Sequence, residues 1–120
     1  MTEKLPTRPP LDAFPYQRHA NSRPFATDMG PGVYIYVQDE NGIVHVLAET
    51  EGHLHPKVLG GGTPAAAAGG MKLEAGGVIV ELDNYSGTFQ FGPEILPQVR
   101  EALERQGGKV APAAERPFDH

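Results

Sequence analysis

Residues 53–91 read HLHPKVLGGGTPAAAAGGMKLEAGGVIVELDNYSGTFQF, and this stretch decides the fold that the sequence predicts. Two short strand-like runs, Met71–Ala75 and Val78–Leu82, flank Gly76-Gly77, a pattern typical of a β-hairpin. After a group of turn-forming residues, Thr88–Phe91 alternates polar and apolar side chains, as a half-buried strand does. The stretch therefore predicts two paired strands and one further short strand.

A second hairpin is predicted just before this stretch. The runs VYIYVQ (33–38) and IVHVLA (43–48) flank Asp-Glu-Asn-Gly, and Asn-Gly is a strong hairpin signal. A two-residue loop pairs Glu40 with Ile43, and a four-residue loop pairs Gln38 with Ile43. Both registers place the same side chains on each face of the hairpin. The face expected toward the core carries Ile35, Val37, Val44 and Val46. The other face, suited to a half-wet surface or a pocket floor, carries Tyr34, Tyr36, Ile43, His45 and Leu47.

A helix is predicted near the C-terminal end. Its apolar face has helical spacing and consists of Ile95, Leu96, Val99 and Leu103. Because proline disrupts a helix interior, the regular helix should begin near Pro97, after an irregular turn, and Gly107 should end it. Residues 109–120 either add an edge strand at Val110 or form a tail without regular structure.

The N-terminal residues 1–31 form an extended arm in this interpretation, because six of the twelve prolines lie there. The arm either packs along the domain or is a disordered leader. The predicted class is α+β: an antiparallel sheet of about five short strands (two hairpins plus one), one C-terminal helix and the Pro-rich arm. Residues 32–108 form the single domain, and residues 109–120 form the C-terminal tail.

Composition narrows the function classes. The chain has 120 residues, a net charge of −5 and no cysteine. The acidic balance argues against nucleic-acid binding, and the absence of cysteine excludes disulfides and thiolate chemistry. No apolar run is long enough to span a membrane, and the N-terminus lacks the apolar core of a signal peptide. We expect a cytoplasmic protein, or one exported by a specialised secretion system without a signal peptide.

The glycine- and alanine-rich loop allows two interpretations. Thr63 could cap one helical turn over Ala65–Ala68, and the free N–H groups of Gly61, Gly62 and Thr63 could then bind an anion. Alternatively, the small residues form a stretch where two backbones approach closely. The sequence alone does not decide between them.

Three groups of side chains are candidates for chemistry. His53 and His55 would lie on one side of an extended segment and, with His45 or Asp83, could hold a metal. The cysteine pairs and longer constellations of zinc sites are missing, so we predict no metal and no cofactor. A neutral imidazole at His55 would suit general base catalysis. Asn84 and Ser86 would either contact a substrate or cap the backbone of their own turn.

The order of these motifs resembles a known pattern. The matching segments are HPKVLGGG from His55, Ala67-Ala68-Gly69, the Gly77-Val hairpin and YSGTF from Tyr85. They resemble a domain of plant IQ-motif calmodulin-binding proteins, which also occurs in the C-terminal regions of some bacterial polymorphic toxins. The likeness covers about half the chain, within residues 32–107. Thr88 and Phe89 stand where the family has its second histidine and a tyrosine, so either catalysis has changed or the domain only binds.

The resemblance implies a toxin- or effector-like domain that acts on or binds a nucleotide- or phosphate-bearing ligand. His55 and Ser86 are then the expected catalytic residues. The expected ligand-binding residues are His45, His53, Gly61, Gly62, Thr63 and Asn84. The alternative is a non-catalytic module that docks on a parent secretion protein, an immunity protein or a phage-like assembly. Docking would use the N-terminal arm or the face with Tyr34, Tyr36 and His45.

Overall fold

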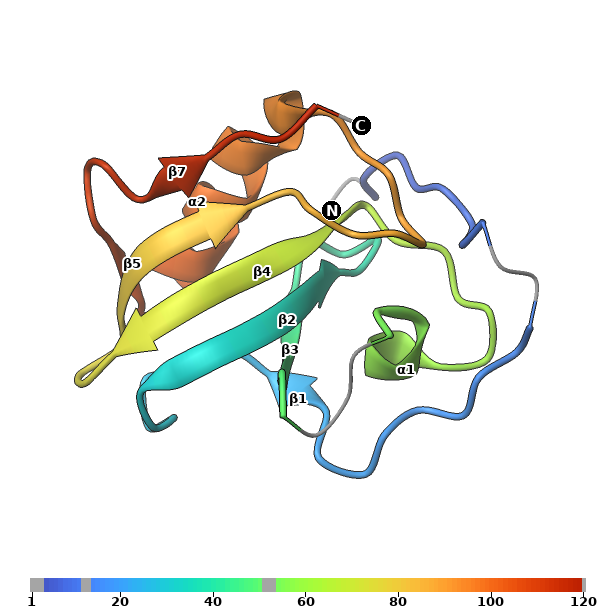
Figure 1. Cartoon of the computed structure of the whole chain (residues 1–120), viewed down its shortest axis with the longest axis horizontal. Helices are drawn as coiled ribbons and strands as arrows, with labels where there is room; N and C mark the ends of the chain where they lie inside the picture. Colours follow the sequence, from blue (N-terminus) through green and yellow to red (C-terminus); the bar gives the residue numbers. More distant parts are fainter. Residues whose placement is uncertain (1–3, 12–13, 51–53, 120) are drawn as a thin grey trace.

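Seven strands form one mixed, curled sheet that resembles a half-barrel in this computed structural model, which describes residues 4–11, 14–50 and 54–119 (Figure 1). The strands are β1 (Arg23–Pro24), β2 (Gly32–Gln38), β3 (Val44–Ala48), β4 (Ala67–Glu74), β5 (Val78–Asp83), β6 (Lys109–Val110) and β7 (Glu115–Arg116). Their order is β1-β3-β2-β4-β5-β6, and β7 also pairs with β5. The helices are α1 (Pro56–Leu59), the 3-10 turn η1 (Pro93–Ile95) and α2 (Leu96–Arg105).

The predicted α+β class, both hairpins and the C-terminal helix are confirmed. The helix begins with η1 and continues into α2, so an irregular turn does precede the regular helix. Its apolar face is buried against the sheet at Ile95, Leu96, Val99 and Leu103. Three aspects of the predicted sheet were wrong. It has seven strands and not about five. The sheet is not purely antiparallel, since β6 and β7 run parallel to β5, and Thr88–Phe91 is not a strand.

Thr88–Phe91 has the burial pattern of a strand without the pairing of one. Phe89 and Phe91 are buried, as the alternation predicts. The carbonyl groups of this segment are instead taken by other partners: the Leu11 N–H donates to Thr88 O (2.9 Å), and the Asn84 side chain donates to Phe91 O (2.8 Å). The segment is therefore held between the arm and a side chain, and no ladder forms.

The register of the β2–β3 hairpin differs from both predicted registers. Gln38 pairs with Val44, and the loop contains Glu40, Asn41 and Gly42 between Asp39 and Ile43. The Asp39 carboxylate accepts hydrogen bonds from the Asn41 and Ile43 N–H groups, and Gly42 has a φ of +87°, which a three-residue loop requires. A loop with an odd number of residues shifts the pairing by one residue. The side chains predicted to share one face are therefore divided between the two faces. Both sides are nevertheless buried, since Tyr36 and Val37 have no exposed surface.

The alanine-rich stretch is a strand, so the helical alternative was wrong and the close-approach alternative is confirmed. Ala67–Gly70 pairs with β2, and a Cβ on Gly69 would lie only 2.0 Å from Asp83 O. Thr63 is not a helix cap, because its hydroxyl donates to Gly60 O (2.6 Å). Gly69 is glycine because the end of β5 passes directly over it.

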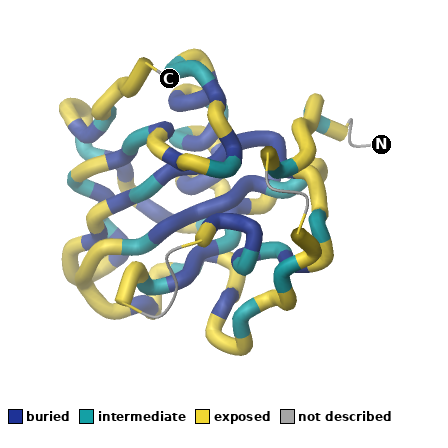
Figure 2. Tube along the Cα trace, turned by 45° about the vertical axis from the view of Figure 1, so that its right-hand side comes forward, coloured by how far each residue is buried: buried dark blue, intermediate teal, exposed yellow. Residues whose placement is uncertain are grey.

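Both ends of the chain pack against the central strands. In the arm, Leu5 bonds to Glu40, and Arg8 forms a β-bridge with Ala65, so the described part of the arm packs along the domain. The C-terminal segment adds β6, which includes Val110, and β7. Figure 2 shows that the central strands are mostly buried, whereas much of the arm is exposed.

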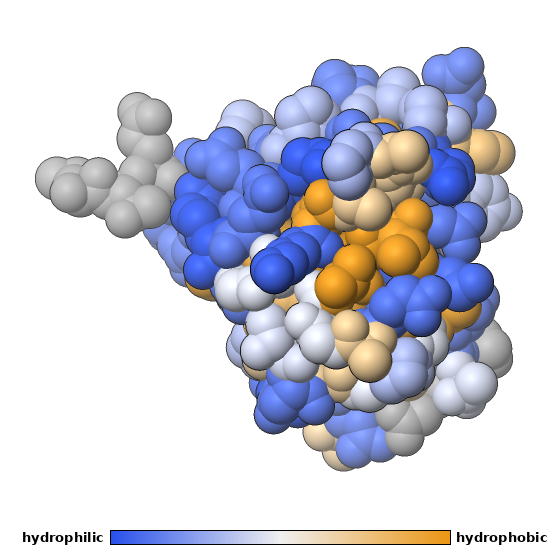
Figure 3. Space-filling model, turned by 90° about the vertical axis from the view of Figure 1, so that its left-hand side faces the viewer, coloured by the Kyte–Doolittle hydropathy of each residue, from blue (hydrophilic) through white to orange (hydrophobic). Residues whose placement is uncertain are grey.

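The described helices include none that is long and apolar enough to cross a bilayer. The view of the sheet end where β4 and β5 join shows one apolar area bordered by hydrophilic residues (Figure 3). The core therefore comes close to the surface at this end of the molecule.

Replacing Gly69 with alanine should destabilise the protein by about 3 kcal/mol or more, because the new Cβ would overlap the Asp83 carbonyl and force two central strands apart. Urea unfolding would measure this change. Gly87→Ala is the matched control, since a Cβ at Gly87 meets nothing within 4 Å. Equal stability of the Gly69→Ala protein and the parent would show that the two backbones are not in contact.

Candidate functional site

A pocket of about 290 Å³ lies on one face of strands β2, β4 and β5. The register places Ile35 beside Gly70 and Lys72 beside Glu81, and alternation puts these side chains on the face opposite to Tyr36 and Gln38. His55 from the start of α1, Tyr85 after β5 and Arg116 from β7 complete the wall. The lining residues are Val33, Tyr34, Ile35, Glu49, His55, Gly69, Gly70, Met71, Lys72, Glu81, Asp83, Tyr85 and Arg116.

His55 is held in one tautomer. Its side chain is buried, and Nε2 lies 2.8 Å from Gly69 O. A carbonyl oxygen only accepts, so Nε2 carries the proton and Nδ1 keeps a lone pair. No described group bonds to Nδ1. Burial lowers the pKa of His55 below its ordinary value of 6.5, and the bond to Gly69 opposes this shift only in part. The imidazole is therefore neutral near pH 7, with Nδ1 as its basic atom.

Asp83 is held at the end of β5 by backbone groups. Its Oδ1 accepts hydrogen bonds from Gly70 N (2.8 Å) and Tyr85 N (2.9 Å). Burial raises the pKa of Asp83, while these two N–H groups oppose the shift and the charges of Glu81 and Glu49 add to it. Its other oxygen, Oδ2, has no hydrogen bond within the described residues. Asp83 therefore holds a proton to a higher pH than an ordinary aspartate.

One peptide group connects the two side chains. Gly69 C=O accepts from His55, and Gly70 N–H, part of the same peptide unit, donates to Asp83. Donation to the carbonyl makes the attached N–H a better donor, so the two bonds strengthen each other. A neutral imidazole and a carboxyl with a raised pKa thus share one pocket, the arrangement that pairs a general base with a general acid.

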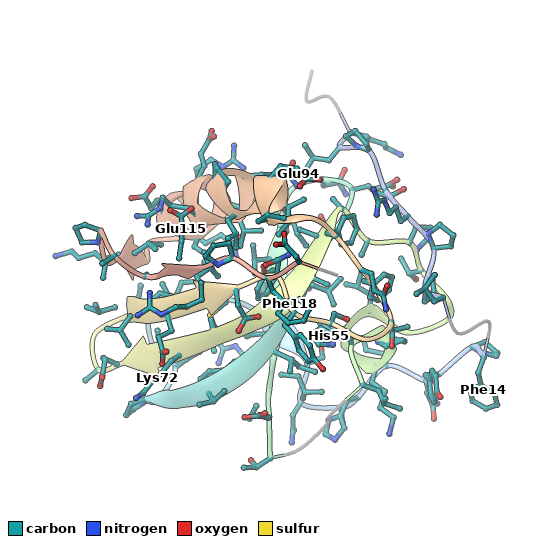
Figure 4. The ribbon with its side chains drawn as sticks, turned by 45° about the horizontal axis from the view of Figure 1, so that its top comes forward. Phe14, His55, Lys72, Glu94, Glu115 and Phe118 are labelled. Atoms are coloured by element: carbon teal, nitrogen blue, oxygen red, sulfur yellow. The ribbon has the colours of Figure 1, made fainter. Side chains whose placement is uncertain are left out.

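Charged side chains line the remainder of the pocket. Lys72 is the cross-strand neighbour of Glu81, and Arg116 Nε lies 3.8 Å from the Glu81 carboxylate. Glu49 follows the end of β3. Figure 4 shows His55 beside α1 and Lys72 farther along β4, toward the β4–β5 turn. The pocket therefore has an acid–base region near His55 and a mixed-charge region near Lys72.

The two polar residues predicted in the turn after β5 have structural contacts. Ser86 is fully buried, and its Oγ accepts hydrogen bonds from the N–H groups of Thr88 (3.3 Å) and Phe89 (3.1 Å). Asn84 is also fully buried and donates to Phe91 O and Phe118 O. Ser86 therefore caps the backbone of its own turn, as one alternative predicts, whereas Asn84 bonds to the backbone of more distant segments. Neither side chain lines the pocket.

The remaining predicted residues do not join His55. His45 and Thr63 line a second pocket of about 320 Å³, where His45 Nε2 lies 2.8 Å from Asp39 Oδ2 and its Nδ1 is buried without a partner. In the predicted anion loop, Gly61 N already donates to Tyr16 O and Thr63 N to Gly60 O. Gly62 does not line either pocket. His53 lies outside the described residues.

Sequence reasoning missed several residues of the pocket. It considered Asp83 only as a possible metal ligand, and it gave Gly70, Lys72 and Arg116 no role. The sequence did hold one signal for Asp83. It ends a strand just before a turn, opposite the Gly69-Gly70 pair on the neighbouring strand. The described residues contain no group of three His, Cys, Asp or Glu side chains that could hold a metal ion.

Comparison with known protein families, with curated proteins and with solved structures found no match for this chain. The functional argument therefore depends on the residues and geometry of the pocket.

Stability should depend on pH through His55. The unfolded histidine binds a proton near pH 6.5 and the buried one resists it, so acid favours the unfolded state. The free energy of unfolding should fall as the pH decreases through 6.5, by at most about 1.4 kcal/mol per pH unit for one proton. His55→Gln keeps a donor for Gly69 and should reduce this slope. Urea unfolding between pH 5.5 and 7.5 measures it.

Asp83 contributes to the pH dependence of stability with the opposite sign. Its raised pKa gives stability at low pH that is lost as the pH rises above 3.8. Asp83 is present in both the parent and His55→Gln, so subtracting their free energies of unfolding at each pH isolates the contribution of His55. His19→Gln is the control at a half-buried imidazole outside the pocket and should keep the parent slope. Parallel stability curves for the parent and His55→Gln would contradict a buried neutral His55.

Removing the Asn84 side chain should release the C-terminal segment. Asn84→Ala leaves Phe118 N without its 2.7 Å bond and Phe91 O unbonded, so we expect a loss of about 2–4 kcal/mol. Amide hydrogen exchange should become faster in residues 115–118. Asn41→Ala, at an exposed loop position, is the control. Unchanged exchange in this segment would show that Asn84 does not hold it.

Proposed function

We propose that this chain is an effector-type domain of the polymorphic-toxin class, with a small-molecule pocket that acts by proton transfer on a phosphate-bearing ligand. The observation that carries the proposal is the shared peptide: His55 and Asp83 bond to the two ends of the Gly69–Gly70 amide inside one pocket. Their remaining polar atoms, His55 Nδ1 and Asp83 Oδ2, have no hydrogen bonds within the described residues.

The two side chains have complementary roles. His55 Nδ1 accepts a proton from an attacking hydroxyl group or water, and Asp83 returns one to the leaving oxygen from its protonated form, which its raised pKa favours relative to an ordinary aspartate. The direction of each pKa supports this division, since burial lowers the pKa of His55 and raises that of Asp83. Lys72 and Arg116 supply positive charge for a phosphate group.

The family's second histidine is replaced by Thr88, and Asp83 provides an acid in its place. Thr88 is only partly buried and lies outside the pocket lining. The family resemblance supplies the biological setting, and the pocket geometry supplies the chemistry.

Expression in the bacterial cytosol tests the proposal. The parent chain should arrest growth and His55→Gln should relieve the arrest, because general acid–base catalysis contributes about 10²–10⁴-fold to a rate. Glutamine still offers a donor for Gly69, so the fold is kept while the base is removed. Asp83→Asn, which keeps an Oδ1 acceptor, should also relieve the arrest.

His45→Gln is the matched control, because this imidazole faces the second pocket and should leave the arrest unchanged. Urea unfolding of each variant separates loss of activity from loss of fold. A parent chain that does not slow growth, or a folded His55→Gln variant that is equally toxic, would reject the proposal.

A second candidate function is docking on a partner protein through the N-terminal arm. Leu11 is 69% exposed although its own N–H is bonded to the domain, so a large apolar side chain is presented to solvent on a fixed backbone. Tyr34, Tyr36 and His45 do not form one docking face, since the register places His45 on the opposite side of the sheet and Tyr36 is fully buried. Equal toxicity of the parent and His55→Gln would favour this candidate.

A further inference from the structure

The mouth of the pocket carries an exposed aromatic ring. Tyr85 lies two residues after the end of β5, lines the pocket and is 57% exposed. The ring of Phe118 meets it edge-on, with 4.8 Å between ring centroids and 88° between planes. An exposed ring that is supported by a second ring offers a flat apolar surface of low conformational freedom.

The buried Asn84 side chain fixes this pair of rings. It donates to Phe118 O (2.7 Å) and accepts from Phe118 N (2.7 Å), so it pairs with the C-terminal backbone as a strand would. Tyr85 follows Asn84 in the chain, and its N–H donates to Asp83 Oδ1 (2.9 Å), so the backbones that carry both rings are held at the end of β5. The same segment brings Arg116 of β7 to the pocket.

The mixed-charge region of the pocket carries two cationic side chains. Lys72 and Arg116 both line it, together with the carboxylates of Glu49 and Glu81. Lys72 is the cross-strand neighbour of Glu81, and Arg116 Nε lies 3.8 Å from that carboxylate. Lys72 has no ion pair among the described residues, so it remains available to an anion. Residues two apart on one strand face are about 7 Å from each other. Lys72 therefore lies about 7 Å along β4 from Gly70, whose N–H donates to Asp83.

We infer that the ligand is a free mononucleotide, whose base stacks on Tyr85 and whose phosphate contacts Lys72 and Arg116. The inference deepens the proposed function and rests on it. Arg116 is the register partner of Asp83, and Lys72 lies two residues beyond Gly70, so the sugar and its ester bonds would lie close to the acid–base pair. Glu49 offers an acceptor for a ribose hydroxyl group.

The size and charge of the protein favour a single nucleotide over a polymer. The pocket volume of about 290 Å³ is near the lower limit of small-molecule sites, about 300 Å³. A nucleic-acid strand needs a continuous basic track, and this chain has a net charge of −5. Stacking on one aromatic ring tolerates any base, so base type should matter little.

Isothermal titration with AMP, adenosine and ribose 5-phosphate tests the inference. AMP should bind more tightly than either fragment. Tyr85→Leu should weaken AMP binding about tenfold and leave ribose 5-phosphate unaffected, because only the stacked base is lost. Lys72→Gln should weaken AMP and ribose 5-phosphate but not adenosine.

Tyr85→Phe is the matched control and should keep the parent affinity for AMP, since it retains the ring. Absence of AMP binding at millimolar concentration would overturn the inference, as would equal affinities of the parent and Tyr85→Leu for AMP. These outcomes are independent of the growth test with His55→Gln. Toxicity that requires His55 without AMP binding would reject the mononucleotide and leave the proposed function standing.

Discussion

The fold and the pocket both depend on the close contact between Gly69 on β4 and the end of β5 at Asp83. A Cβ at Gly69 would lie 2.0 Å from the Asp83 carbonyl oxygen, so this contact exists only where no side chain is present. The contact turns the Gly69 carbonyl toward His55 and the Gly70 N–H toward the Asp83 side chain. The Tyr36 hydroxyl donates to the Asp83 carbonyl (2.7 Å) and fixes the same point from the core side. A packing constraint between two strands therefore also determines where the polar groups of the pocket lie.

Patterns of apolar residues predicted the elements of the fold, and specific side-chain contacts determined how they were joined. The helix at residues 96–105 follows from the spacing of its buried residues. The register of the β2–β3 hairpin does not follow from spacing, because the Asp39 carboxylate and the left-handed Gly42 select an odd loop. An edge strand at Val110 was one of two alternatives, and β6 confirms it. Its parallel pairing and the strand β7 were not predicted, since each strand is two residues long and neither alternates over a length that could be recognised.

The same distinction applies to the candidate site. His55 was identified because imidazole chemistry is recognisable from residue type alone. Its partners were not identified, because one is a backbone carbonyl and Asp83 is connected to it only through the fold. Ser86 and Asn84 looked reactive in the sequence, yet both are fully buried and bond to the backbone. In a turn that lies in the interior, unpaired backbone groups require such side chains, and this need outweighs a role at the surface.

The peptide between His55 and Asp83 has a consequence for how the two side chains titrate. A proton added to His55 increases its pull on Gly69 O, which makes Gly70 N–H a stronger donor and favours the ionised form of Asp83. Loss of the Asp83 proton, in turn, favours the protonated imidazole through the charge and through the same peptide. Two states are thereby preferred: both groups neutral, or both groups charged. A proton that leaves Asp83 as one reaches His55 converts one preferred state into the other, so the transfer that the proposed chemistry requires leaves the summed charge of the two side chains unchanged.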